Sequence, residues 1–353
     1  MLFLGAGASK PFGIPTMEGF TDEILSILEK KDLGYGSMVR EIQTDCAKLD
    51  LKSDIEAVLT ILRGRMEPDK ALRDVGPLVA LFAKDYRIFG LAPNVKPTLA
   101  PNVEASIVVK EIEDAIYQRC LQIDRNAAVR MYDALWNGLR GVNWGSNPFV
   151  NRSPQKFFTT NYDLSVEAFF RRKSWSYDDG FQQDGVGNMA FVSHWGGRGS
   201  AISLYKMHGS IDYYIMEDGK IVRSDAPLET TNIHGERIIG RRMIYPAGEK
   251  YATRWPFFNY LSELRQALFS ESDCLVIGYS FRDVPVNNAF VDAVQMNSSL
   301  RIFLVSPSAS QIRDGMDESL KKHVCSMDRE FAGDPQPLSQ AILEQVRIWR
   351  IPA

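Results

Sequence analysis

The chain has 353 residues, of which 45% are hydrophobic and 24% are charged, and its formal net charge is −3. These values are typical of a soluble globular protein, and the absence of a Lys/Arg block or a basic tail argues against a surface dedicated to nucleic acid. No apolar run is long enough to cross a bilayer, and Met1–Leu4 is too short for a signal peptide. We therefore expect a main domain with an insertion or second domain, without a membrane anchor.

The chain starts with a short apolar strand that runs into the glycine turn Gly5-Ala6-Gly7-Ala8-Ser9 and then into a helix. In α/β sheets this order presents backbone N–H groups to a phosphate. Gly5 permits the tight turn, Gly7 leaves room for a pyrophosphate, and Ser9 supplies a hydroxyl or a helix cap. The dinucleotide fingerprint is incomplete because Lys10 replaces its third glycine, so a strand–turn–helix without ligand fits equally well.

Residues 32–150 are predicted to be a mostly helical insertion after the first strand, because apolar residues recur there at helical spacing. Ser53 and Glu56 are spaced as a capping box in front of one helix. Further helical patterns span 103–121 and 127–139. The prolines between the first and second of these helices predict a surface loop, and they are Pro93, Pro97 and Pro101. The insertion either simply packs, covers a ligand or makes oligomer contacts.

Three later segments are apolar runs of strand length that end in small or polar residues: 157–163, 204–210 and 274–283. In a parallel sheet, ligands bind beyond the carboxyl ends of the strands, so these ends and the glycine turn are expected to meet at one edge. Another strand is predicted at 301–305, helices at 255–270 and 286–296, and a hairpin turn at 217–220.

Each polar strand end also has a purely structural interpretation. Asp163 precedes Leu164 and Val166 in a pattern that suits a helix N-cap. His208, which is followed by a glycine, suits an ordinary turn, and so does the segment 278–280. Only the ordered set of segments favours a functional site over these readings.

The cysteine pattern indicates a reducing compartment, and we expect a cytoplasmic protein. The four cysteines stand far apart in the sequence and form neither a C-x-x-C pair nor a disulfide framework; they are Cys46, Cys120, Cys274 and Cys325. The four histidines are equally scattered, so no metal site is expected.

The motifs, taken in chain order, resemble the motif series of the sirtuin fold. They are Gly5–Ser9 with Gly13-Ile14-Pro15, then Thr159–Asp163, His208-Gly209 and Gly278–Ser280. The resemblance is closest to the sirtuin-like domains of bacterial antiphage defence proteins, which look like NAD hydrolases. It implies an α/β fold: a Rossmann-like parallel sheet with flanking helices, formed by residues 1–31 and 151–310. Residues 32–150 are then the helical insertion and 311–353 a C-terminal extension.

Two departures from the deacetylase sirtuins disfavour acyl-lysine chemistry. Those enzymes carry a zinc module of C-x-x-C pairs, which this chain lacks. After the proline of the first motif they continue with an acidic residue, Phe and Arg, whereas here the residues are Thr16-Met17-Glu18. Neither departure removes the ability to bind NAD.

The resemblance assigns roles residue by residue. Asn161 and His208 match the family's essential asparagine and histidine, which implies that they are catalytic. Asp163 would accept a hydrogen bond from the nicotinamide amide. The remaining cofactor-binding residues implied are Gly5, Ala6, Gly7, Ser9, Pro15, Thr16, Thr160, Gly278, Ser280 and Ser306.

These roles suit cleavage of the bond between nicotinamide and ribose. Nicotinamide leaves as a neutral group through an oxocarbenium-like state, so no strong general acid is needed. An asparagine amide can hold the attacking water or a ribose hydroxyl, and an imidazole can act as general base. The sequence therefore predicts an enzyme that hydrolyses NAD to nicotinamide and ADP-ribose without a metal.

The resemblance also implies a biological setting. NAD depletion would stop the growth of an infected cell, so the activity must be held off until it is triggered by another polypeptide or by oligomerisation. Chains of this kind resemble those encoded beside a HerA-type ATPase or a short Argonaute, and we expect a homo-oligomer. Two alternatives stay open: a module that senses NAD or ADP-ribose without cleaving it, and an NAD-dependent protein deacylase.

Overall fold

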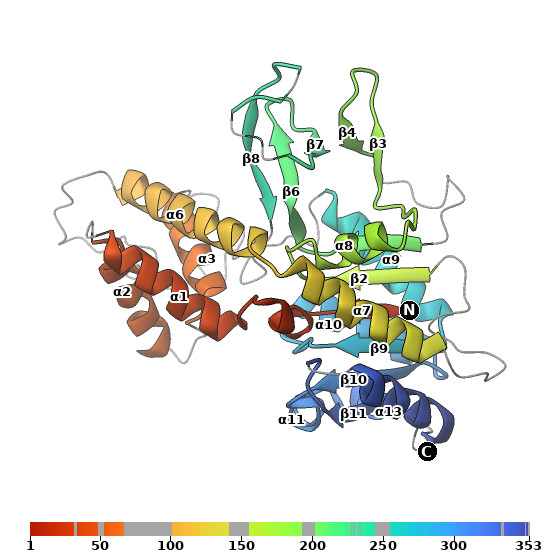
Figure 1. Cartoon of the computed structure of the whole chain (residues 1–353). Coiled ribbons are helices and arrows are strands. Elements are labelled where there is room, and N and C mark those ends of the chain that lie inside the picture. The colour runs from red at the N-terminus through yellow and green to blue at the C-terminus, as the bar shows by residue number, and fades with distance from the viewer. Residues whose placement is uncertain are drawn as a thin grey trace. The chain divides into compact units, whose positions relative to one another are not determined.

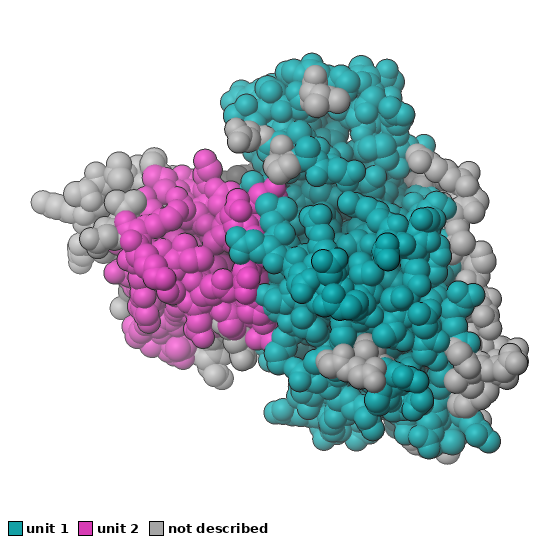
Figure 2. All heavy atoms as spheres, in the orientation of Figure 1, with its two compact units in different colours: residues 1–14, 120–244, 252–353 teal, residues 15–119, 245–251 magenta. Residues whose placement is uncertain are grey.

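The structure is a computed structural model that describes residues 1–31, 34–48, 53–66, 101–140, 155–192, 202–226, 228, 230–232, 234–243, 255–332, 335–349 and 351. The chain divides into two compact units (Figure 2). The first comprises Met1–Ile14, Cys120–Ile244 and Ala252–Ala353, and the second comprises Pro15–Arg119 and Tyr245–Tyr251. Among the described residues, no helix has the length and apolar composition needed to cross a membrane.

The first unit contains a parallel six-stranded sheet with the order β11-β10-β9-β1-β2-β5 (Figure 1). The chain proceeds outward from β1 through β2 to β5, and then crosses to the other side of β1 for β9, β10 and β11. This is the 3-2-1-4-5-6 order of doubly wound nucleotide-binding folds, and it places the topological switch point between β1 and β9. The strands are β1 (Leu2–Leu4), β2 (Gln155–Thr159), β5 (Ile202–Lys206), β9 (Asp273–Ile277), β10 (Arg301–Ser306) and β11 (Val324–Asp328).

Helices cover both faces of this sheet, which confirms the predicted fold class. Leu2 and Leu4 point to one face and share a core with α7, α8 and α13. Phe3 points to the other face and packs against Phe290 of α10, with ring centroids 5.6 Å apart. Because both faces are buried, the central strands are nearly continuous apolar runs. The helices of this unit are α7 (Arg125–Arg140), α8 (Ser165–Arg172), α9 (Phe257–Ser270), α10 (Val284–Met296), α11 (Ala309–Asp314), α12 (Glu318–Lys321) and α13 (Pro335–Ile348).

A second, antiparallel sheet of the first unit has the order β3-β4-β7-β6-β8. The predicted hairpin turn joins β6 to β7, and Gly219 in this turn has a φ of +82°. The rest of this sheet was not predicted. Its strands are β3 (Phe181–Gln183), β4 (Met189–Phe191), β6 (Gly209–Met216), β7 (Ile221–Arg223) and β8 (Ile238–Met243).

The second unit is helical where the structure describes it. It contains α1 (Met17–Lys30), α2 (Tyr35–Lys48), α3 (Ile55–Met66) and most of α6 (Pro101–Leu121). The first turn of α3 is capped by Asp54, whose Oδ1 accepts the Ala57 N–H at 3.0 Å. The predicted cap at Ser53 was therefore one residue early. Pro101 begins α6, as suits a residue without an N–H, whereas Pro93 and Pro97 lie outside the described residues.

The two units divide the chain differently from the predicted domains. The longer segment of the second unit is Pro15–Arg119 and does not include α7, because α7 buries its apolar face in the core of the first unit. The predicted C-terminal extension also belongs to the first unit. It supplies β11, which pairs with β10, and α13, whose Leu338, Ile342 and Leu343 are in the same core.

Candidate active site

The strands of the parallel sheet end at the same level. Leu4 is in register with Thr159 on one side and with Ile277 on the other, and the register extends to Lys206 of β5 and Val305 of β10. We call the residues that follow these ends the carboxyl edge. It comprises Gly5, Thr160, Met207, Gly278 and Ser306, with their immediate successors. Ligands of doubly wound sheets bind at this edge beside the switch point, so the predicted strand ends do meet where a ligand is expected.

The glycine turn packs against the end of β9. A Cβ on Gly5 would lie 2.5 Å from the carbonyl oxygen of Gly278, and a Cβ on Gly7 would lie 2.8 Å from the Gly278 Cα. Gly278 itself has a φ of +65°. These glycines are therefore required by the close contact of two backbone segments at the switch point, whatever ligand binds there.

Most N–H groups of the glycine turn already have acceptors. Gly5 donates to the carbonyl of Ile277, Gly7 to that of Gly278, Ala8 to that of Gly5 and Ser9 to that of Ala6, at 2.9 to 3.1 Å. The segment continues as the 3₁₀ turns η1 (Ala6–Ala8) and η2 (Lys10–Phe12). Of the five residues Gly5–Ser9 of the turn, Ala6 alone has no backbone acceptor for its N–H among the described residues, so Ala6 is the amide of the turn best suited to a phosphate.

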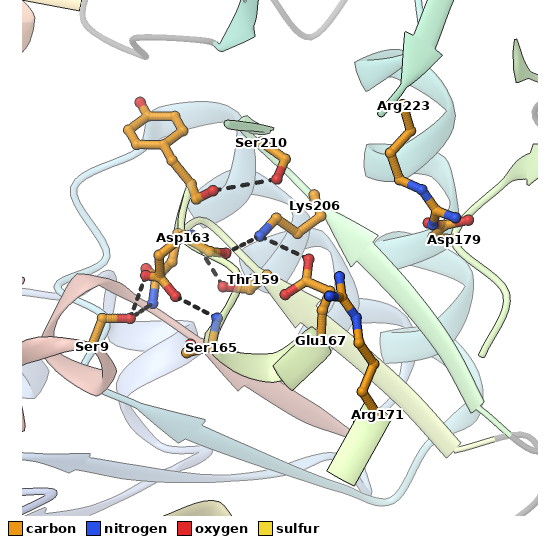
Figure 3. Close-up of polar contacts among 12 residues, drawn as sticks. Ser9, Thr159, Asp163, Ser165, Glu167, Arg171, Asp179, Lys206, Ser210 and Arg223 are labelled. Carbon is orange, nitrogen blue, oxygen red and sulfur yellow. Dashed lines mark hydrogen bonds and ion pairs between the residues drawn. The ribbon is translucent and has the colours of Figure 1, made fainter. Parts of the chain in front are cut away.

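Ser9, Asn161 and Asp163 form a buried hydrogen-bonded network across the ends of β1 and β2. Figure 3 shows Ser9 and Asp163 of this network. The Ser9 hydroxyl donates to Asp163 Oδ2 at 2.7 Å and accepts from Asn161 Nδ2 at 2.8 Å. Asn161 Nδ2 also donates to the Gly5 carbonyl at 2.9 Å. Asp163 Oδ1 accepts the Ser165 N–H at 2.9 Å, but the N-cap of α8 is Leu164, so the predicted cap at Asp163 was one residue early.

One atom of this network has no partner. Asn161 is only 8% exposed, and its Oδ1 is buried without a hydrogen bond in the described part of the chain. A buried amide oxygen without a partner costs about 1–3 kcal/mol, a cost that a bound hydroxyl or water would offset. Since both N–H bonds of the amide are used within the protein, the Asn161 side chain can offer a ligand only a hydrogen-bond acceptor.

A buried charge cluster lies beside this network and was not predicted. Lys206, at the end of β5, pairs with Glu167 of α8 at 3.2 Å, and its Nζ also donates to the main-chain carbonyl of Asp163 (Figure 3). Lys206 thus ties the loop that carries Asn161 to α8. The signal in the sequence was a lysine at the end of an apolar strand, but its partners became apparent only from the fold.

Asp212 of β6 belongs to the same cluster. Burial, together with the nearby Glu167 carboxylate, raises its pKa from the ordinary 3.8 to about 6, although Lys206 lowers it in part. Its Oδ1 is buried and has no hydrogen-bond partner among the described residues. The protonated form of Asp212 therefore suits this position better than the ionised form does.

His208 lies in the turn between β5 and β6 and is 5% exposed. Its Nε2 is 2.6 Å from Oδ2 of Asp283, the N-cap residue of α10. Its ring also lies 6.4 Å from that of Tyr162. The following Gly209 has a φ of +80°, which explains why a glycine follows this histidine.

The other predicted residues have different surroundings. Thr160 and Ser306 are buried at the ends of β2 and β10, and Ser280 is exposed after β9. Pro15 and Thr16 belong to the second unit, so their role in binding stays a prediction. Among the described residues, no group of three or more His, Cys, Asp or Glu side chains could hold a metal ion.

Residues 155–325 match the family model of the SIR2-like domain. This part of the chain is therefore similar to SIR2-like domains. The match runs from β2 into β11 and includes Asn161 and His208, whereas β1 and the glycine turn lie outside it. The predicted resemblance to sirtuins is confirmed at this level, and the link to antiphage defence stays a prediction.

Solved structures similar to this chain include Sir2 homologues. One in complex with NAD has 12% identity over 98% of this chain and 88% of its own, with a TM-score of 0.45. A mutant Sir2 homologue in complex with ADP-ribose has 12% identity over 99% of this chain and 94% of its own, with a TM-score of 0.43. A comparison with curated proteins found no match.

Proposed function

We propose that the chain is an NAD hydrolase that cleaves the nicotinamide–ribose bond at the carboxyl edge of its parallel sheet. The observation that carries this proposal is the unpartnered Oδ1 of Asn161, buried beside the switch point of a fold similar to SIR2-like domains. An acceptor aimed at a ligand suits a ribose hydroxyl or the attacking water. A phosphate would instead require donors, and Ala6 is the candidate for that contact.

The proposed reaction uses one water molecule. Its oxygen forms a bond to the anomeric carbon, the bond between that carbon and the nicotinamide nitrogen breaks, and neutral nicotinamide leaves with the electron pair. The products are nicotinamide, ADP-ribose and one proton. In this scheme Asn161 Oδ1 orients the water or a ribose hydroxyl, and the His208 imidazole accepts the proton.

The test is to incubate the purified chain with NAD and to follow the release of nicotinamide and ADP-ribose. We expect Asn161→Ala and His208→Asn each to lower the rate by about 10²–10⁴-fold. His323→Asn is the matched control, because His323 precedes β11 at the amino edge of the same sheet and its Nδ1 lies 2.7 Å from the Leu300 carbonyl oxygen there. Thermal unfolding of all variants separates loss of chemistry from loss of fold.

Three outcomes are informative. Release that is lost in both site variants and kept in His323→Asn supports the proposal. Release that persists in both site variants means that the chemistry lies elsewhere. NAD binding without release, even with a HerA-type ATPase and DNA added, favours the sensing module instead.

The proposed biological role is NAD depletion in antiphage defence, controlled by oligomerisation or by a partner such as a HerA-type ATPase or a short Argonaute. This part of the proposal rests on the resemblance of the motifs to defence proteins. Growth arrest with a fall in cellular NAD on infection, abolished by His208→Asn, would support it.

A further inference from the structure

The pair formed by His208 and Asp283 joins two distant parts of the sheet. His208 follows β5 and Asp283 follows β9, and in the sheet these strands are separated by β2 and β1. Three strand spacings amount to roughly 14 Å. The two segments that carry His208 and Asp283 must therefore extend toward each other past the ends of β1 and β2, where the glycine turn and Asn161 lie, for Nε2 and Oδ2 to be 2.6 Å apart.

Both side chains of the contact are buried. The His208 and Asp283 side chains are 6% and 4% exposed. In such surroundings a hydrogen bond between an imidazole and a carboxylate is stronger than in water, and replacing one partner leaves the other without it.

The segment that delivers Asp283 is held in an uncommon conformation. Phe281 has a φ of +54°, which is rare for a bulky residue. Its ring is held between Tyr279 at 4.9 Å and Phe290 of α10 at 5.1 Å. Packing of this aromatic group offsets the backbone strain and fixes the turn between β9 and α10, which places the Asp283 carboxylate.

The two oxygens of Asp283 have separate partners. Oδ1 accepts the Val286 N–H at 3.4 Å and caps α10, whereas Oδ2 faces His208. An ionised carboxylate only accepts hydrogen bonds, so Nε2 of His208 must carry the proton in this contact. In a neutral imidazole the other nitrogen, Nδ1, is then the atom that can accept a proton.

We infer that Asp283 is a positioning residue that fixes His208 in the Nε2–H tautomer and thereby makes Nδ1 the proton acceptor of the reaction. The inference rests on the proposed function for its chemistry, but its geometry is independent of it. As Nδ1 takes a proton from the water or from a ribose hydroxyl, the ring becomes an imidazolium, and the Asp283 carboxylate stabilises that positive charge without itself being protonated.

The substitution Asp283→Asn tests this role, because an amide has only one acceptor oxygen. That oxygen can accept either from the Val286 N–H or from the Nε2–H of His208. The amide NH₂ group then faces the remaining one of these two donors. Asparagine is a good N-cap, so capping of α10 is expected to prevail and the tautomer to invert. We expect kcat for NAD cleavage to fall by about 10²–10⁴-fold, while KM for NAD changes by less than about threefold.

Two further variants separate positioning from capping. Asp283→Ser retains a capping oxygen and removes the carboxylate, and we expect it to lose about as much kcat as Asp283→Asn. Asp317→Asn makes the same change at the N-cap of α12, where the carboxylate accepts the Ser319 N–H, and we expect it to leave kcat unchanged. Loss of kcat in Asp317→Asn as well, or full kcat in either Asp283 variant, would overturn the inference.

A second readout does not depend on activity. Nitrogen-15 NMR of the full chain with labelled histidine distinguishes the two imidazole tautomers, and the spectrum of His208→Asn identifies the His208 signals. We expect Nε2–H in the native chain and Nδ1–H in Asp283→Asn. Nδ1–H in the native chain would overturn the inference. Nε2–H in a chain that releases no nicotinamide would support the pair and refute the proposed function.

Discussion

Asp212 and Gly278 are single residues of the first unit whose surroundings affect the stability of the fold. Asp212 is 6% exposed beside Glu167 and Lys206, so the folded state opposes its ionisation. Gly278 occupies a left-handed backbone conformation in contact with the glycine turn. Each residue makes a separate prediction about the free energy of unfolding.

The Asp212 carboxyl should make the protein less stable as pH rises. Its pKa is about 6 in the folded state and ordinarily 3.8, so stability is greatest below pH 4 and is lost as pH rises through 6. The difference corresponds to about 3 kcal/mol at most. We expect Asp212→Asn to match the native chain near pH 4 and to exceed its unfolding free energy at pH 8, measured by urea denaturation.

The exposed Asp218 of the β6–β7 turn provides the control for this experiment. Asp218→Asn should leave the pH dependence between pH 4 and 8 as it is in the native chain. An Asp212→Asn variant less stable than the native chain at pH 8 would show that the ionised carboxylate stabilises the cluster.

Gly278→Ala should lower the free energy of unfolding by more than the cost of placing an alanine in a left-handed backbone conformation. A Cβ there would lie 2.3 Å from the Ala8 nitrogen and 2.5 Å from the Gly7 carbonyl carbon. Gly219 is the matched control, because its φ is +82° and no atom of the described residues lies within 4 Å of a Cβ built on it. We expect Gly219→Ala to cost about 1 kcal/mol and Gly278→Ala about 1–3 kcal/mol more, from urea midpoints with equal slopes. Equal losses would contradict the close packing at the switch point.

The sequence singled out candidate site residues by their place in motifs, but it did not indicate which residues contact them. Asn161 and His208 stand at strand ends, where a polar residue after an apolar run is conspicuous. Asp283, the last residue of the segment 274–283, and Glu167 were assigned no role from the sequence. Their contacts with His208 and Lys206 join residues 75 and 39 positions apart and depend on strand order, which periodicity does not specify.

At the scale of elements, the strands that were predicted are those buried on both faces. The residues Leu275, Val276 and Ile277 of β9 are fully buried, and such strands are recognisable as apolar runs. The edge strand β11 was missed because Ser326 and Asp328 interrupt its apolar pattern. The strands β3 and β4 were missed because each has three residues, too few to establish an alternation.

The helices around the site show the same dependence on context. The predicted helix at 286–296 begins at Val284 in the structure, because the cap is Asp283 and not a residue nearer the apolar pattern. Because the helix begins two residues earlier than predicted, its N-cap is Asp283, whose carboxylate contacts His208. The start of this helix thus decides which residue lies beside His208.

At the scale of the whole molecule, the first unit holds the complete doubly wound sheet and all the predicted catalytic residues. The second unit holds Pro15, Thr16 and the helices α1, α2 and α3. The proposed hydrolase must be restrained until it is triggered, and we propose that oligomerisation or a partner protein provides that control. The sequence predicted a helical insertion but not that it begins as early as Pro15.

A crystal structure of the His208→Asn variant with NAD would test the central proposal most directly, because this variant is expected to bind NAD without consuming it. We expect the nicotinamide ribose at the carboxyl edge, with one of its hydroxyls or a water within about 3.2 Å of Asn161 Oδ1. NAD bound at any other part of the chain, with Asn161 Oδ1 still without a partner, would contradict the proposed site.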